Sequence, residues 1–189
     1  MLLDYLKQIP DHRRAQGRRF KLEHILLTSI LAILSGAESY RDIARFMKGR
    51  LTQFKDWFGI NWKCAPSKTN LRDILCYVNK PALEKIFRNY SRNLAGSYAN
   101  DPKNSMGFAI DGKALRGSFD HLKGNAMLHL LSVFCTDNQL ILGHVEIPEK
   151  TNEIPTAQAL IKELGLPEGS VYTLDAMHCQ KKRLKQLKK

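Results

Sequence analysis

Two aspartates, each at the end of a short apolar stretch, are the residues best suited to chemistry in this sequence. The apolar segment 108–110 ends at Asp111, which Gly112 follows, and the β-rich run 171–174 ends at Asp175. A buried strand that ends on a carboxylate, with a glycine that lets a ligand approach the backbone, commonly holds a metal ion or a phosphate at the rim of a sheet. The pair indicates a metal site with two carboxylates, although an aspartate at either position is also typical of a turn or a helix cap.

Cationic and imidazole side chains accompany both aspartates. Lys113 and Arg116 follow Asp111, and His178 follows Asp175. A few hard oxygen ligands that leave room for substrate phosphates suit Mg²⁺, or Mn²⁺ in its place. Such ions can activate a water or a 3′-hydroxyl for phosphodiester cleavage or strand transfer. Lys113, Arg116 and His178 are the candidates to hold phosphates or to orient groups around the metal.

A second candidate site is a basic loop near the start of the chain. Arg13, Arg14, Arg18 and Arg19 lie within seven residues, with Gly17 as a hinge. The planar fork of arginine suits phosphate oxygens, so this loop is a candidate DNA-contacting arm. A solvated basic loop explains the charge equally well, and both interpretations stay open.

The overall charge favours a polyanionic partner. The 189 residues include 30 Lys and Arg against 18 Asp and Glu, a net charge of +12. This balance is typical of proteins that bind nucleic acid or an anionic membrane surface, although a merely soluble basic protein shares it. The four cysteines are widely spaced with no CxxC pair, which argues against a zinc finger and a disulfide framework. The most apolar segment, 25–34, is too short to span a bilayer, and we expect a cytoplasmic protein without a membrane partner.

The elements that position these residues fall into two classes along the chain. Residues 1–96 show helical periodicity, the polar segment 97–105 is a candidate linker, and residues 106–189 alternate as strands do. Helices are predicted over 2–9, 22–35, 39–47, 51–58, 68–77 and 81–94. Strands are predicted over 108–111, 127–136, 140–147 and 171–174, with a hairpin turn at 137–138 and a crossover helix over 155–164.

The short basic helices of residues 1–96 resemble a helix-turn-helix module. The helix over 68–77 would then be the recognition helix and would present Lys68, Asn70 and Arg72. A helical bundle that binds nothing fits the same pattern, so this assignment stays open.

The order of elements after residue 106 predicts a mixed sheet. A helix between the third and fourth strands makes the fourth run parallel to another strand. This is the order of ribonuclease H-like domains, in which the first and fourth strands are neighbours. On such a sheet Asp111 and Asp175 would lie within reach of a shared divalent ion.

The motifs resemble a known family. The segments IPDHRRAQGRRF, SYRDIARF, AIDGKALRGS, HLLSVF, EKTNEIP and TLDAMHCQ occur in the order seen in DDE transposases of bacterial insertion sequences, of the ISAs-type subgroup that includes the H-repeat-associated proteins. The resemblance runs from Ile9 to Gln180. It implies a mixed α+β protein: a helical transposase-associated domain over 1–96 and a partial ribonuclease H-like catalytic domain over 106–189. Asp111 then matches the first catalytic aspartate and Asp175 the second, with the DNA ends of the mobile element as substrate.

The family's third acidic residue has no counterpart in this sequence. Glu149 and Glu153 belong to the EKTNEIP motif, and the ending KKRLKQLKK has six basic residues in nine and no acid. We therefore expect a truncated transposase, an enzyme with little or no strand-transfer activity, that self-associates or acts alone. The alternatives are a non-catalytic DNA-binding protein that retains only the helical region, and a remnant that does not fold stably by itself.

Overall fold

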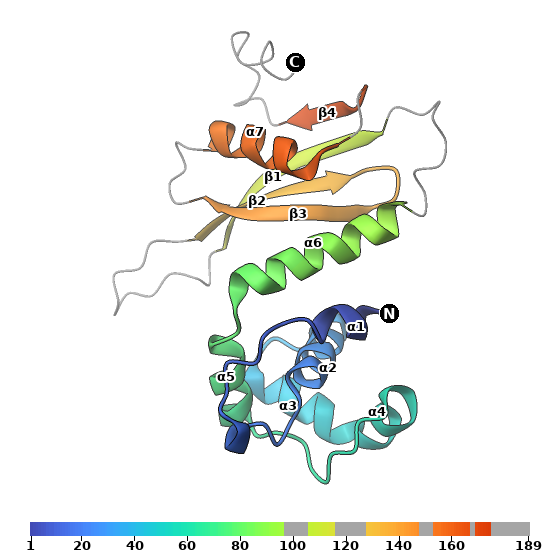
Figure 1. Cartoon of the computed structure of the whole chain (residues 1–189), viewed down its shortest axis with the longest axis vertical. Helices are drawn as coiled ribbons and strands as arrows, with labels where there is room; N and C mark the ends of the chain where they lie inside the picture. Colours follow the sequence, from blue (N-terminus) through green and yellow to red (C-terminus); the bar gives the residue numbers. More distant parts are fainter. Residues whose placement is uncertain (97–105, 116–127, 148–152, 167–168, 175–189) are drawn as a thin grey trace. The chain divides into compact units, whose positions relative to one another are not determined.

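The computed structural model describes residues 1–96, 106–115, 128–147, 153–166 and 169–174 (Figure 1). The chain forms two compact units, Met1–Phe87 and Arg88–Lys189, whose boundary falls inside one helix. The linker predicted over 97–105 lies outside the described residues, and the division into domains 1–96 and 106–189 stays a prediction. Together the described segments make a mixed protein of helices followed by a four-stranded sheet, as expected from the change of periodicity.

Residues 1–96 are helical, and each helix predicted there is present. The first helix ends at Leu6 and not at Ile9, and a short 3₁₀ turn, η1 (Ala15–Gly17), lies within the arginine-rich loop. The helices are α1 (Leu2–Leu6), α2 (Leu22–Leu34), α3 (Tyr40–Gly49), α4 (Leu51–Phe58), α5 (Lys68–Cys76) and α6 (Lys80–Gly96).

Local capping explains where these helices begin and end. The Ser39 hydroxyl accepts a hydrogen bond from the Asp42 amide, and the Ser67 hydroxyl accepts one from the Asn70 amide, each at 3.2 Å. These contacts satisfy amide donors that the first turn of a helix leaves without partners. Gly36 adopts a φ of +89° at the end of α2, and the amides of Gly36 and Ala37 bond back to the helix. The caps are encoded locally, which is why they were predictable.

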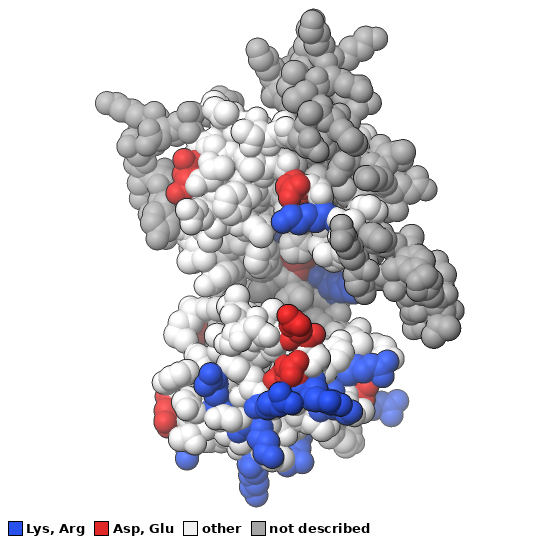
Figure 2. Space-filling model, turned by 180° about the vertical axis from the view of Figure 1, so that it is seen from behind, with Lys and Arg blue, Asp and Glu red and all other residues white. Residues whose placement is uncertain are grey.

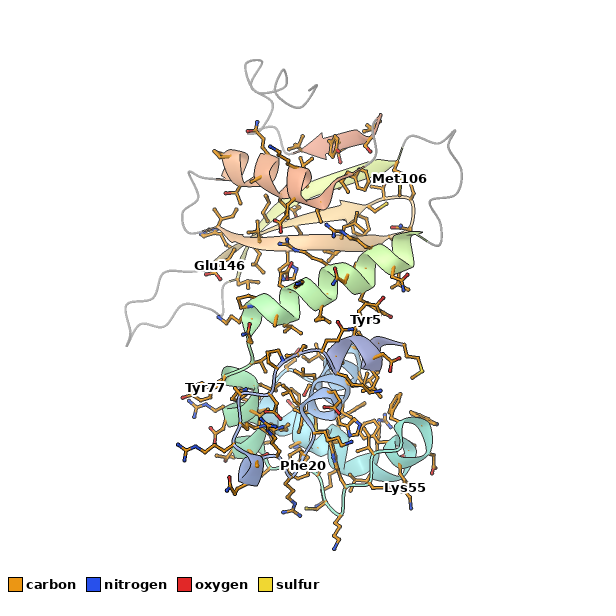
Figure 3. All side chains as sticks on the ribbon, in the orientation of Figure 1. Tyr5, Phe20, Lys55, Tyr77, Met106 and Glu146 are labelled. Carbon is orange, nitrogen blue, oxygen red and sulfur yellow. The ribbon has the colours of Figure 1, made fainter. Side chains whose placement is uncertain are left out.

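The core of the helical unit forms around α2. Ile25 and Ala32 have no exposed surface, and Met47 and Leu71 from α3 and α5 are equally buried. Phe20, labelled in Figure 3, enters this core directly after the arginine-rich loop and packs edge-on against Trp62. One shared apolar core holds these helices together and stabilises the short ones, which would be marginal alone.

The sheet unit contains four strands in the order β3-β2-β1-β4. The pairs β1–β2 and β2–β3 are antiparallel, and β4 runs parallel to β1. The predictions that the second and third strands form a hairpin and that the first and fourth strands are parallel neighbours are confirmed. The elements are β1 (Gly107–Leu115), β2 (Leu128–Cys135), β3 (Leu140–Ile147), α7 (Glu153–Leu164) and β4 (Val171–Leu174).

The prediction that the first strand ends at Asp111 is wrong. Strand β1 continues to Leu115, and Asp111, Gly112 and Lys113 pair with residues of β2. The physical reason is that β2 is long enough to supply hydrogen-bond partners for the whole segment, and a partner strand decides where a strand stops. Asp111 therefore lies within the ladder and not at its end.

The core of the sheet unit lies on one face, between the strands and α7 (Figure 1). Phe108 and Ile110 of β1 and Leu131 of β2 are at most 4% exposed. Leu160 and Leu164 of α7 pack against them, while Tyr172 of β4 stacks on Phe108 with ring centroids 5.7 Å apart. Residues between these on each strand point to the opposite face, because side chains alternate along a strand.

The C-terminal part of α6 is joined to this layer by two arginines. The Arg88 guanidinium pairs with the Glu163 carboxylate of α7 and donates a 3.0 Å hydrogen bond to the His144 carbonyl of β3. Arg92 donates a 3.1 Å bond to the Glu163 carbonyl. These contacts explain why the compact sheet unit begins at Arg88, inside α6.

None of the helices described for this chain has the length and apolar composition that crossing a bilayer would require.

Candidate functional site

Asp111 lies on the face of the sheet that α7 does not cover. It pairs with Ser132 of β2. Burial alternates along residues 107–110, and every residue from Asp111 to Leu115 is exposed. Ile110 faces the core while the Asp111 side chain is 64% exposed. A carboxylate with this exposure keeps most of its oxygen lone pairs available to an external cation.

Lys113 is the nearest cation to Asp111 among the described residues. Its Nζ atom lies 3.7 Å from Oδ2 of Asp111, and its side chain is 76% exposed. The two residues are separated by one position on β1, so they share the open face. An exposed pair at this distance is weak, and a stronger cation can displace the amine from the carboxylate at little cost.

The pairing of β1 with β4 bears on the prediction that Asp111 shares a metal site with Asp175. Ile110 lies opposite Leu174 in the parallel pair, and each is followed directly by one of the two aspartates. Asp175, Arg116 and His178 lie outside the described residues. The neighbouring strands are confirmed, while the shared site of Asp111 and Asp175 stays a prediction.

Within the described ranges, no group of three or more His, Cys, Asp or Glu side chains is placed to hold a metal ion. Asp111 thus brings one hard oxygen ligand to the open face, with Lys113 beside it. One carboxylate alone binds a divalent ion weakly, so a metal site here needs further ligands.

Asp137 is a carboxylate near this strand that the sequence did not single out. Its Oδ2 atom accepts a 2.8 Å hydrogen bond from the Gly107 amide, and the neighbouring Thr136 hydroxyl donates a 3.0 Å bond to the Gly107 carbonyl. Gly107 has no room for a side chain, because an added Cβ would collide with Thr136 Oγ1. Asp137 and Thr136 therefore position the start of β1. In the sequence, the predicted hairpin turn at 137–138 was the only feature that pointed to this part of the chain.

The arginine-rich loop is organised around the Arg13 and Asp11 side chains. Arg13 donates to both carboxylate oxygens of Asp11, at 2.9 and 2.8 Å, and to the carbonyls of Gly17 and Phe20. These hydrogen bonds hold the pKa of Asp11 below its usual value, against an opposing effect of burial. The Arg13 side chain is only 9% exposed, so its fork is occupied inside the loop and poorly placed for a phosphate.

The other three arginines of the loop differ from Arg13. Arg18 is about half exposed and donates to the carbonyls of Arg13 and Asp11. Arg19 lies over the Phe20 ring and its Nη2 atom is 3.3 Å from Cys64 Sγ. The Arg14 side chain is exposed and has no hydrogen-bond or ion-pair partner among the residues that the structure describes. DNA binding by this loop stays a prediction, and it falls to Arg14, Arg18 and Arg19.

The expected recognition helix, α5, is present and exposes Lys68, Asn70 and Arg72. It packs alongside α3, and Leu71 and Ile74 enter the core from its inner side. A helix with one buried and one polar face is equally typical of a plain bundle, so the helix-turn-helix assignment stays a prediction.

The chain is similar to known proteins over its whole length. The family model described as DDE_Tnp_1-associated matches residues 3–91. The H repeat-associated putative transposase YhhI of Escherichia coli (strain K12) is 32% identical over 188 residues, which is 100% of this chain and 48% of the relative. The H repeat-associated putative transposase YbfD of the same strain is 30% identical over 188 residues, or 100% of this chain and 72% of the relative.

A third relative gives the same result. The putative transposase YncI of Escherichia coli (strain K12) is 31% identical over 180 residues, covering 95% of this chain and 70% of the relative. The chain spans about half the length of some of these relatives, such as YhhI, at 48%. No solved structure matches the chain. Similarity at this level along the full sequence shows that the chain belongs to the family of DDE transposases that includes the H repeat-associated proteins.

Proposed function

We propose that this chain acts in DNA transposition, and that its sheet unit carries carboxylates of a divalent-metal site for DNA strand cleavage and strand transfer. The observation that supports this most directly is the parallel register of β1 and β4. Ile110 and Leu174 lie side by side, and the next residue in each segment is an aspartate. Residues in register on neighbouring parallel strands point to the same face, so the register favours a common site for Asp111 and Asp175.

The strand order supports a ribonuclease H-like domain. An antiparallel hairpin precedes a crossover helix, and the fourth strand then joins the sheet beside the first. This is the order expected from the sequence motifs of the family. Such a sheet places β1 between β2 and β4, where its side chains are held from both sides.

The described residues fit a hard divalent cation. Asp111 offers exposed carboxylate oxygens on the face that α7 does not cover, and among the described residues only the weakly paired Lys113 competes for them. Asp111 and Asp175 would hold Mg²⁺ or Mn²⁺, which polarises phosphoryl oxygens and activates the attacking water or hydroxyl in this class of reaction. Lys113 lies close enough to Asp111 to neutralise it, and an incoming phosphate would attract the lysine away from the carboxylate. Arg116 and His178 are the further candidates to hold phosphate oxygens.

The resemblance assigns two of the three acidic residues of a DDE site within residues 1–189. We therefore propose that this stretch by itself has little or no strand-transfer activity. A second candidate function is DNA binding without catalysis, which the exposed cations of the helical unit favour. In both functions the partner is DNA, in the cytoplasm, and self-association of the chain is an open part of the proposal.

The test uses the purified chain with duplex DNA that carries the ends of its own element. With Mg²⁺ or Mn²⁺ we expect binding of the DNA and at most weak nicking, which Asp111→Asn abolishes. The control variant Asp56→Asn, an exposed aspartate of α4, keeps whatever nicking the unchanged chain shows. Metal-dependent nicking that survives Asp111→Asn would overturn the assignment of the site. Robust strand transfer by the unchanged chain would overturn the proposed impairment.

A further inference from the structure

A basic hollow lies between α3 and the segment that connects α4 to α5. It has a volume of about 580 Å³. Arg45 and Lys48 from α3 and Lys63 from the connection line it, together with apolar side chains that include Ala44 and Leu51. Among the residues that the structure describes, no carboxylate lines this hollow. Three cations around an apolar floor make a concave surface of one charge.

A second hollow, of about 550 Å³, adjoins the first through Arg45, which lines both. Arg41 from the first turn of α3 and Lys68 from the first turn of α5 line this second hollow. Asp42 is the one carboxylate that lines it in the described ranges. Its Oδ2 atom accepts a 2.5 Å hydrogen bond from the Ser39 hydroxyl, and its Oδ1 atom lies 3.5 Å from a guanidinium nitrogen of Arg45.

Together the two hollows form what we call the α3–α5 basic surface. It carries a net positive charge, because only Arg45 among its cations has a carboxylate within ion-pair distance in the described part of the chain. The Arg45 side chain is nevertheless 75% exposed. Like charges held this close repel each other, so an anion bound among them lowers the electrostatic energy. The members of the surface are Arg41, Arg45, Lys48, Lys63 and Lys68.

Two further features add positive potential to the same place. The nine-residue helix α5 begins at Lys68. The N-terminus of a helix carries a partial positive charge, because its first amide groups have no partner within the helix. The guanidinium of Arg19 contacts Cys64, which lines the first hollow next to Lys63. The arginine-rich loop is thus continuous with the α3–α5 basic surface. Figure 2 shows Lys and Arg gathered over the helical unit on the face that it presents.

We propose that the α3–α5 basic surface binds the sugar-phosphate backbone of duplex DNA without reading its sequence. The proposal extends the function proposed above, since DNA is the substrate there, but it needs neither the metal nor Asp111. Cations from α3, α5 and the connecting segment spread over two adjoining hollows, and a polymer of regularly spaced phosphates can occupy both at once. Four of the five cations lie on helices α3 and α5, which the core fixes, so little ordering of the backbone is required on binding.

The composition of the surface disfavours two other anionic partners. A membrane interface pairs cations with exposed large apolar side chains, but Tyr40 is the only such side chain, among those described as exposed, that lines either hollow. A single phosphorylated peptide would be recognised by one convergent pocket, whereas these cations form an extended array.

The experiment measures binding of the full chain to a short duplex of random sequence, in EDTA and over a range of salt concentrations. The variant replaces three members of the surface: Arg45→Gln, Lys48→Gln and Lys63→Gln. A matched control removes the same charge from exposed lysines elsewhere in the helical unit: Lys55→Gln, Lys80→Gln and Lys85→Gln. Lys55, labelled in Figure 3, lies on α4. Circular dichroism melts verify that both variants fold.

We expect the slope of log affinity against log salt to fall by about 2.7 in the surface variant, because each phosphate contact contributes about 0.9. The control variant keeps a slope close to that of the unchanged chain. Equal losses in the two variants would overturn the proposal, since net charge alone would then explain binding. Tighter binding to vesicles of phosphatidylserine and phosphatidylcholine than to duplex DNA would also overturn it.

A second measurement uses the unchanged chain and does not depend on the folding of a variant. Lysine acetylation is followed by mass spectrometry with and without the duplex. We expect protection of Lys48, Lys63 and Lys68 and none of Lys55 or Lys85. Protection of the control lysines alone would refute the surface. These assays run without metal, so a negative result would refute DNA binding by the α3–α5 basic surface and would not bear on the proposed metal site at Asp111. In the same way, loss of nicking in Asp111→Asn would not bear on DNA binding by the surface.

Discussion

Ile110 on β1 lies directly opposite Leu174 on β4, in the parallel pair at one edge of the described sheet. Both side chains belong to the core that α7 covers, with Ile110 only 4% exposed. A shift of this register by one residue would move Leu174 to the open face, so burial fixes the pairing. In the sequence, Asp111 and Asp175 directly follow the two members of this pair.

The first prediction concerns the metal. Mn²⁺ titrated into the full chain gives a free-ion electron paramagnetic resonance signal that falls as the ion binds. We expect Asp111→Asn to weaken binding by at least about tenfold, because it removes one of the two hard ligands that we propose. Asp56→Asn makes the same change of charge in the helical unit and should leave the affinity unchanged. Equal affinities in Asp111→Asn and the unchanged chain would exclude Asp111 as a ligand.

The second prediction concerns the contact that holds β4 to β1. Phe108 is 1% exposed and stacks on Tyr172, so Phe108→Ala should lower the free energy of unfolding of the sheet unit by about 3–5 kcal/mol. Val171→Ala truncates an exposed residue of the same strand pair and should cost no more than about 0.5 kcal/mol. Urea denaturation of the full chain, followed by circular dichroism, measures both. Similar losses in the two variants would contradict the packing described.

The third prediction separates two arginines of one loop. Arg13→Gln removes the charged hydrogen bonds to Asp11 and two carbonyls, and we expect it to cost about 1–3 kcal/mol of unfolding free energy. The Arg14 side chain is exposed, so Arg14→Gln should change the free energy of unfolding by less than about 0.5 kcal/mol. In DNA binding the order should reverse, with Arg14→Gln losing affinity in a salt-dependent way. Thermal melts that show no difference between the variants would contradict the structural role of Arg13.

The fourth prediction is a pH dependence. Burial lowers the pKa of His24 below 6.5, with Lys21 and Lys7 acting in the same direction and Glu23 opposing them. The unfolded chain therefore takes up this proton more readily than the folded one. Stability from neutral His24 is fully present above 6.5 and is lost as the pH falls through the lowered pKa.

The measurement is the melting temperature of the chain as the pH falls through 6.5, the ordinary value for this histidine. We expect His24→Gln to flatten the decline, because it removes the group that binds the proton on unfolding. His12→Gln replaces an exposed histidine of the same unit and should follow the unchanged chain. An identical decline in His24→Gln would show that another group is responsible.

Much of the helical unit was predictable because its signals are local. Ser39 and Ser67 cap helices through contacts three residues away, and Gly36 and Gly59 end helices because they adopt positive φ angles at little cost. The parallel direction of β4 was also predictable, since a crossover helix between two strands of one sheet makes them parallel, and its place beside β1 was expected from the ribonuclease H-like order.

The end of β1 and the roles of the arginines were not predictable from local signals. Whether β1 stops at Asp111 or continues to Leu115 depends on how far β2 offers hydrogen-bond partners. Arg13 and Arg14 are neighbours of the same type, yet only the closed loop shows which one meets Asp11 and the Phe20 carbonyl.

The amino-acid sequence by itself determined the change from helices to strands, the caps, the parallel neighbour of β1 and the family. Only the tertiary structure decided that Arg41, Arg45, Lys48, Lys63 and Lys68 line two adjoining hollows, and that Asp111 lies on an open face beside Lys113. The physical reason is one of range. Periodicity and capping act within a few residues, whereas surfaces and ladders form between segments that the core brings together.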